Sequence, residues 1–194
     1  MLKLKLATDP RWVNIAEKNI EEILIDHAFC EQKAASTAIS FIVTYPEYSD
    51  LVADMTDLAR EEMQHFKLVH NKLLERGLKL GFDRKDPYVA DIRKFFNKTK
   101  DRKLNLVNRL LLAAMIEARS CERFRLLSEN IKDQELSKFY YDLMKSEATH
   151  YTMFLQYARK FGEGRMKVDE VWEQFLEFEA DVMKNYSNKE LIHG

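Results

Sequence analysis

Four stretches of this chain share one unusual feature, a glutamate in the middle of an otherwise apolar helical stripe. Residues at steps of three and four lie on one face of a helix. A lone carboxylate on such a face costs several kcal/mol unless a positive group meets it or it takes up a proton. The four stripes are Ile20, Leu24, His27, Glu31, Ala34, Ala38 and Phe41; Leu51, Met55, Leu58, Glu62, His65, Val69 and Lys72; Leu106, Leu110, Ala113, Glu117, Ser120 and Phe124; and Leu136, Tyr140, Leu143, Glu147, His150, Phe154 and Tyr157.

The spacing of these glutamates relates the two halves of the chain. Glu31 and Glu62 are 31 positions apart, Glu117 and Glu147 are 30 apart, and equivalent residues of the two halves are separated by 85 or 86 positions. Two of the glutamates have a histidine three residues later, on the same helical face. Four glutamates and two Glu-x-x-His motifs on a four-helix bundle are the ligand set of di-iron and di-manganese carboxylate proteins. The predicted metal ligands are Glu31, Glu62, His65, Glu117, Glu147 and His150.

Charge balance explains why these residue types are needed. Two divalent cations bring four positive charges, four glutamates cancel them, and neutral histidines complete the coordination. Oxygen and nitrogen ligands suit iron and manganese, whereas only two cysteines, Cys30 and Cys121, argue against a zinc–thiolate or iron–sulfur site.

Three neighbouring polar residues have open interpretations. Glu122 lies about 140° around the helix from Glu117, so Glu117 is the better ligand. Glu61 either orients a metal-bound histidine or is an exposed helical glutamate. His27 is on the stripe of Glu31 and is interpreted as a hydrogen-bonded core residue.

Composition and helix signals predict an all-α fold in a single domain, residues 1–194. Five glycines and three prolines with 32% charged residues favour long amphipathic helices. We expect a ferritin-like four-helix bundle with a long crossover between helices two and three and an extra C-terminal helix that buries Val171, Trp172, Phe175, Phe178 and Val182. The predicted helices cover residues 10–18, 20–44, about 49–77, 88–96, 100–130, 133–160 and 168–186. The chain has no signal peptide or membrane-length apolar run, so we expect a soluble, cytoplasmic protein with no membrane partner.

The crossover is basic. Residues 76–103 contain ten lysines and arginines against four aspartates, a net charge of +6 in a chain whose net charge is −1. Aromatic residues Phe82, Tyr88, Phe95 and Phe96 are interleaved with these cations. Such a segment can hold phosphates while its aromatic rings stack on unpaired bases, and a solvated surface is the alternative. The candidate RNA-binding residues are Arg84, Lys85, Arg93 and Lys94.

Three segments carry a resemblance to a known family. Residues 24–38 (LIDHAFCEQKAASTA), 60–66 (REEMQHF) and 116–124 (IEARSCERF) resemble the bacterial tRNA-(2-methylthio-N6-isopentenyladenosine) hydroxylases. The resemblance implies a non-haem di-iron monooxygenase that uses O2 to hydroxylate the isopentenyl group of the modified adenosine beside the anticodon. It implies two iron ions as cofactor and the tRNA anticodon loop, not DNA, as partner. We interpret Arg119 and Arg123 as parts of a structural ion-pair network rather than phosphate ligands.

This chemistry needs two electrons from outside the chain. The sequence has no iron–sulfur cysteine motif and no glycine-rich nucleotide-binding fingerprint, so an electron-transfer reductase or ferredoxin is expected as a partner. The main alternative is a ferritin-type iron-storage or iron-oxidising protein. A rubrerythrin-like peroxidase is disfavoured because paired Cys-x-x-Cys motifs are missing, and a metal-free RNA-binding bundle is a further alternative.

Overall fold

The computed structural model describes residues 2–83, 87–186 and Ile192, and every regular element in them is a helix. The chain divides into two compact units, one formed mainly by residues 18–85 and the other by residues 1–17 and 86–189. The elements in chain order are α1 (Trp12–Lys18), α2 (Ile20–Thr44), α3 (Ser49–Glu75), α4 (Pro87–Ile92), the 3₁₀ turn η1 (Arg93–Phe95), α5 (Arg102–Asn130), α6 (Gln134–Gly162) and α7 (Val168–Met183). No described helix combines the length and apolarity needed to span a bilayer.

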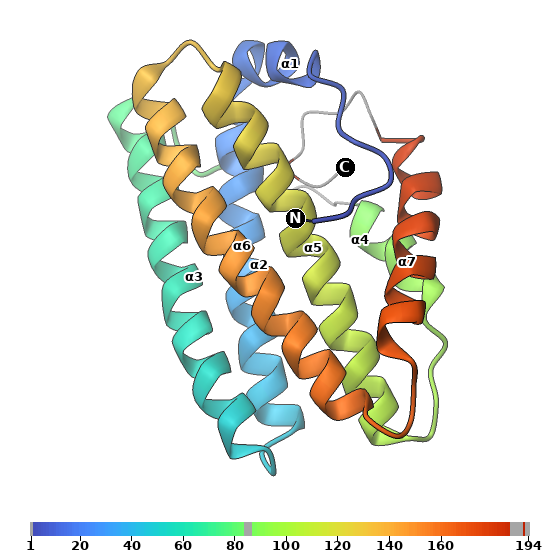
Figure 1. The fold of residues 1–194 in the computed structure, drawn as a ribbon. Helices are drawn as coiled ribbons and strands as arrows, with labels where there is room; N and C mark the ends of the chain where they lie inside the picture. Colours follow the sequence, from blue (N-terminus) through green and yellow to red (C-terminus); the bar gives the residue numbers. More distant parts are fainter. Residues whose placement is uncertain (1, 84–86, 187–191, 193–194) are drawn as a thin grey trace. The chain divides into compact units, whose positions relative to one another are not determined.

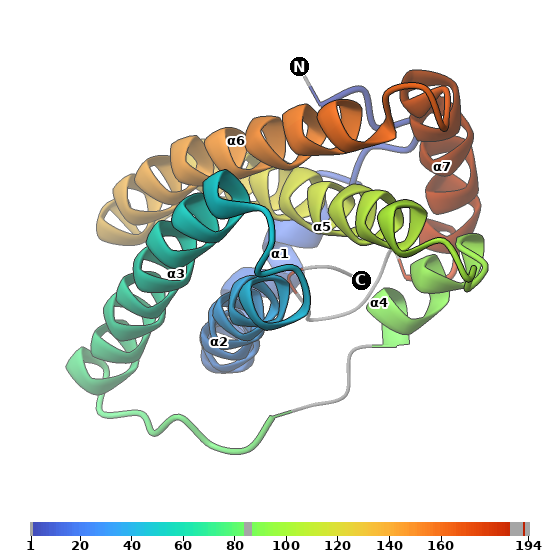
Figure 2. The same ribbon diagram turned by 90° about the horizontal axis from the view of Figure 1, so that it is seen from below.

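The first unit is the α2–α3 hairpin, whose helices are joined by the short turn of residues 45–48 (Figure 2) and pack against each other. Each helix buries its glutamate-bearing stripe. Gly77 ends α3 with φ +71°, and the amide of Leu78 donates to the carbonyl of Leu73 at 2.9 Å. Glycine adopts this left-handed conformation at the C-terminus of a helix without steric cost.

The second unit is built on the α5–α6 hairpin, with α7 and the short α4 packed beside each other (Figure 1). Asp101 and Asp133 cap α5 and α6, each accepting two backbone N–H groups. From Ala113 to Leu127 nearly every residue of α5 is buried, so this helix forms the core of the unit. Gly162 is required at the end of α6, because a Cβ there would lie 2.3 Å from Cγ2 of Val168.

The sequence-based helix bounds agree with the structure to within a few residues, including the short helical segment in the crossover. The predicted face of α7 was partly wrong. Trp172 and Phe175 are buried, but Val171, Phe178 and Val182 are only half-buried, and the buried face instead includes Glu179. That glutamate is held inside by Arg119, a contact that the pattern of apolar residues does not encode.

Candidate metal centre

Glu31, Glu62 and His65 come together inside the α2–α3 hairpin. All three are buried, and one ligand atom from each lies within 4.8 Å of the others. Nδ1 of His65 lies 3.3 Å from Oε2 of Glu62 on its own helix and 3.6 Å from Oε2 of Glu31 on α2. The hairpin therefore presents two carboxylates and one imidazole to a common point.

His27 supports this group from one turn earlier on α2. Its side chain is fully buried, and its Nε2 lies 2.6 Å from Oε1 of Glu31. This contact confirms that His27 is a hydrogen-bonded core residue and shows that its partner is a predicted ligand. Glu61 is half-exposed, and its Oε1 lies 3.8 Å from Nε2 of His65, which is too far for a hydrogen bond.

Glu117, Glu147 and His150 form the equivalent group inside the α5–α6 hairpin. They too are buried and offer ligand atoms within 4.8 Å of one another, with Nδ1 of His150 3.5 Å from Oε2 of Glu147. Cys121 lies close by, and its thiol contacts the carbonyl of Met144 at 3.4 Å. Burial, reinforced by the charge of Glu147, raises the pKa of Cys121 to about 11.

Each of the two groups fits a divalent ion. Oxygen and nitrogen ligands lie roughly 2 Å from a small divalent cation, so ligands of one ion are at most about 4 to 4.5 Å apart. The ligand atoms of each group lie within 4.8 Å of one another, and the nearest pairs are 3.3 to 3.6 Å apart. Two buried carboxylates side by side are otherwise costly, since like charges in a low-dielectric interior repel.

Arg119, two residues beyond Glu117, is the centre of a buried ion-pair network. It donates to both carboxylate oxygens of Glu179 on α7, at 2.6 and 2.8 Å, and to Glu122 on its own helix. Glu122 also accepts from the amide and hydroxyl of Thr8, at 3.0 and 2.8 Å, and Glu179 accepts from the hydroxyl of Tyr88 at 2.9 Å. The structural role predicted for Arg119 is confirmed, and Glu122 belongs to this network.

Electrostatics in the network follow from burial. Desolvation opposes the charge of Arg119, but Glu179, Tyr88 and Glu122 outweigh it and raise the pKa of the guanidinium. Desolvation also raises the pKa of Glu179, which the arginine only partly offsets. Arg123 is likewise fully buried, with its guanidinium 4.3 Å from the ring centroid of Trp12 on α1. The sequence did not reveal the partners on α7 and on the N-terminal segment, because they are more than 50 positions away.

The structure limits the RNA-binding residues predicted in the crossover. Arg93 and Lys94 are exposed, whereas Arg84 and Lys85 lie outside the described residues. Tyr88 is fully buried against Glu179, and the ring of Phe95 stacks on Phe175 at 4.9 Å. The prediction that these two rings are available to stack on bases was therefore wrong, because both serve the core of the unit.

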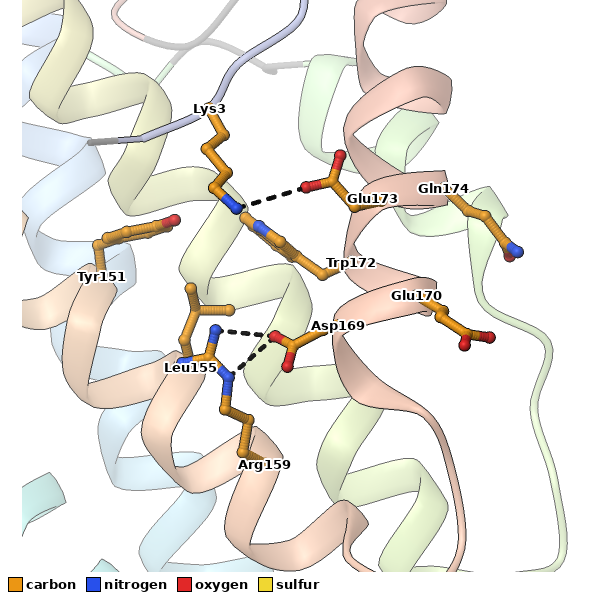
Figure 3. A pocket seen from close by; sticks show the side chains of 9 residues that line it. All are labelled: Lys3, Tyr151, Leu155, Arg159, Asp169, Glu170, Trp172, Glu173 and Gln174. Atoms are coloured by element: carbon orange, nitrogen blue, oxygen red, sulfur yellow. Dashed lines mark hydrogen bonds and ion pairs between the residues drawn. The ribbon is translucent and has the colours of Figure 1, made fainter.

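A cavity of about 530 Å³ lies between α6 and α7 (Figure 3). Its walls carry charges of both signs. Two ion pairs form between residues that line it, Arg159 with Asp169 at 2.8 Å and Lys3 with Glu173 at 3.8 Å. Tyr151 and Trp172 face each other at its inner end, with ring centroids 6.1 Å apart. Because three carboxylates line this cavity, it is a poor site for an anion.

The long paired helices with buried Glu, Glu and His groups define a class, the ferritin-like di-iron carboxylate proteins. One solved structure of this fold, protein 43 with aldehyde deformylating oxygenase activity from Synechococcus, matches with a TM-score of 0.86 and 31% sequence identity, covering 98% of this chain and 95% of that one. Within the class, the chain belongs to the tRNA-(MS[2]IO[6]A)-hydroxylase (MiaE) family, whose model matches residues 2–194.

Two relatives carry the same name, tRNA 2-(methylsulfanyl)-N(6)-isopentenyladenosine(37) hydroxylase. The protein from Pseudomonas putida is 41% identical over 156 residues, which cover 80% of this chain and 75% of the relative. The protein from Salmonella typhimurium is 26% identical, covering 98% of this chain and 87% of the relative. The predicted family and fold class are thereby confirmed.

Proposed function

We propose that this chain is an O2-dependent di-iron monooxygenase that hydroxylates the isopentenyl group of 2-methylthio-N6-isopentenyladenosine next to the anticodon of tRNA. The observation that carries the proposal is the pair of buried Glu, Glu and His groups in a chain that matches the hydroxylase family from end to end. A cytoplasmic location is part of the proposal, since that is where tRNA is modified.

In this proposal Glu31, Glu62, His65, Glu117, Glu147 and His150 together hold two iron ions. The bound metals would supply the reduction of O2 and the cleavage of the C–H bond, which acid and base side chains cannot perform. The protein's own groups have other tasks. Four carboxylates neutralise the ions, His27 fixes the orientation of Glu31, and the apolar residues of the four stripes keep water away from the ligands.

The substrate base has to leave its stack to reach such a site. A tRNA is too large to enter a helical bundle, so the modified adenosine must be splayed out of the anticodon loop with its prenyl tail directed inward. The electrons would come from a separate reductase or ferredoxin, because the two cysteines of the chain cannot hold an iron–sulfur cluster.

A single-turnover reaction tests the function directly. Chemically reduced, iron-loaded protein is mixed with O2 and with tRNA that carries the prenylated adenosine, and the nucleosides are then digested and analysed by mass spectrometry. We expect one hydroxylated nucleoside for about each active site. Failure to form any hydroxylated nucleoside with fully loaded protein would refute the proposal.

The size of the particle in solution distinguishes the hydroxylase from a ferritin-type iron-storage protein. A ferritin-type store requires a closed cage of many subunits, so we expect sedimentation of the iron-loaded protein to give a species of a few chains at most. A shell-sized particle holding many irons per chain would favour storage instead.

We also predict that the crossover contributes to tRNA affinity. Replacing Arg84, Lys85, Arg93 and Lys94 with glutamine removes four positive charges from a segment of net charge +6. The tRNA dissociation constant should rise, and its salt dependence should become shallower by up to about 0.9 per lost phosphate contact. Iron content, measured on the same samples, should stay unchanged. An unaltered RNA affinity would show that these four residues of the crossover do not bind tRNA.

A further inference from the structure

A second cavity, of about 580 Å³, lies between the end of the crossover and the first turns of α5. Its lining differs in chemistry from that of the cavity between α6 and α7, since the described residues that line it include three cations and three asparagines but no carboxylate. The lining residues are Arg93, Phe96, Asn97, Lys98, Thr99, Asn105, Asn108, Arg109 and Leu112.

The acids nearest to this cavity in sequence are already engaged elsewhere. Asp91 accepts from Lys94 at 2.6 Å and from the hydroxyl of Tyr186. Asp101 caps α5 and accepts from Arg165 at 2.6 Å. In the parts of the chain that the structure describes, neither Arg93 nor Lys98 has a side-chain hydrogen bond or a carboxylate partner, so their charges remain available to an anion.

The walls of the cavity are held in place before any ligand arrives. The side chain of Asn105 donates to the carbonyl of Thr99 at 2.7 Å and accepts from its amide at 3.2 Å. Phe96 packs edge-on against Phe175 of α7, with centroids 4.7 Å apart. A rigid wall lowers the entropy that binding would otherwise cost.

The cavity occupies a different face of α5 from the metal ligand. Asn105, Asn108, Arg109 and Leu112 form a stripe, and Leu112 lies about 140° around the helix from Glu117. Along the axis the stripe runs from roughly 8 to 18 Å from Glu117, at 1.5 Å per residue. A group bound here would be beside the reacting nucleotide's site rather than in the path of its prenyl tail.

We propose that this cavity binds a backbone phosphate of the RNA that flanks the reacting nucleotide. The inference rests on the proposed function, because it takes tRNA as the substrate. Arg93, Lys98 and Arg109 supply the charge that a phosphodiester needs. The side-chain amides of Asn97 and Asn108 supply donors and acceptors for the adjoining ribose hydroxyl or base edge, and the volume exceeds that of a lone phosphate.

Two charge-matched double variants test the site. Arg93→Gln with Lys98→Gln removes two charges from the cavity, and Lys79→Gln with Lys100→Gln removes two exposed charges of the same segment that do not line it. Binding of a fluorescent anticodon stem–loop to the iron-free protein is measured by anisotropy at several salt concentrations. We expect the cavity variant to bind roughly 10- to 100-fold more weakly, with a salt slope shallower by about 1 to 2, and the control to change less than about threefold.

Asn108→Asp provides an independent test with almost no change in volume. A carboxylate in the cavity should repel the phosphate and weaken RNA binding roughly tenfold, with an unchanged thermal melting curve. If the two double variants lose affinity equally, or if Asn108→Asp binds like wild type, the cavity is not a phosphate site.

Activity on two substrates separates this inference from the proposed function. The cavity variant should hydroxylate the free modified nucleoside at the wild-type rate, while its kcat/KM for tRNA falls in proportion to the loss of RNA affinity. Equal losses on both substrates would contradict the phosphate assignment. Wild-type protein that binds the stem–loop through the cavity but hydroxylates neither substrate would support the site and refute the hydroxylase function.

Discussion

Replacing Glu62 with alanine is expected to remove stoichiometric iron binding and to lower hydroxylation by at least about 100-fold. Glu62 is completely buried, and its Oε2 lies 3.3 Å from the histidine of the same motif, so its loss deprives both the ion and His65 of a partner. Even outer partners of metal ligands typically contribute 10- to 100-fold to affinity or activity. Iron per chain after anaerobic loading and desalting is the primary measurement.

Thermal melting gives a second readout that does not depend on turnover. Iron at a hundredfold excess over its dissociation constant stabilises the wild-type protein by about 2.7 kcal/mol, which raises Tm by about 5 to 11 °C. A hundredfold weaker site would lose nearly all of that shift. Glu75→Ala is the matched control, since Glu75 is exposed at the end of the same helix and pairs with Lys72. Full iron content in Glu62→Ala would exclude this residue from the ligand set.

Replacing Glu179 with alanine is expected to cost about 3–5 kcal/mol of stability, the usual effect of breaking a buried ion pair. The substitution would leave Arg119 fully buried with two of its strongest hydrogen bonds lost, and would also remove the acceptor of Tyr88. For a chain of this size we expect Tm to fall by roughly 6 to 20 °C. Thermal and urea denaturation of the iron-free protein measure the effect.

A control on the same helix compares the loss of a surface ion pair with the loss of the buried one. Glu173 on α7 pairs with Lys5 at 2.7 Å at the surface, and Glu173→Ala should leave the stability nearly unchanged, because exposed ion pairs contribute little. Glu179→Gln, which keeps one acceptor, should lie between the two. Equal effects of Glu173→Ala and Glu179→Ala would show that the Arg119 network contributes no more than a surface ion pair.

The α7 helix shows what a pattern of apolar residues cannot predict. The predicted face included Val171, Phe178 and Val182, which are only half-buried, whereas Glu179 is buried. Glu179 pairs with a buried arginine that is 60 positions away in sequence, and the apolar residues of one helix do not reveal such a partner. Tyr88 and Phe95 are a second example. Their sequence context suggested rings that could stack on bases, but their partners Glu179 and Phe175 lie on α7, far away in sequence.

The sequence by itself determined the helices and the six candidate ligands, because helical periodicity is a local property and the spacing of the ligands repeats between the two halves of the chain. The structure brings Glu31, Glu62 and His65 together in one hairpin and Glu117, Glu147 and His150 in the other. Only the tertiary structure showed that His27 contacts Glu31, which partners surround Arg119, and where the crossover forms a cavity lined by cations and asparagines. These features depend on which side chains meet across distant segments, and burial energies rather than local propensity decide such contacts.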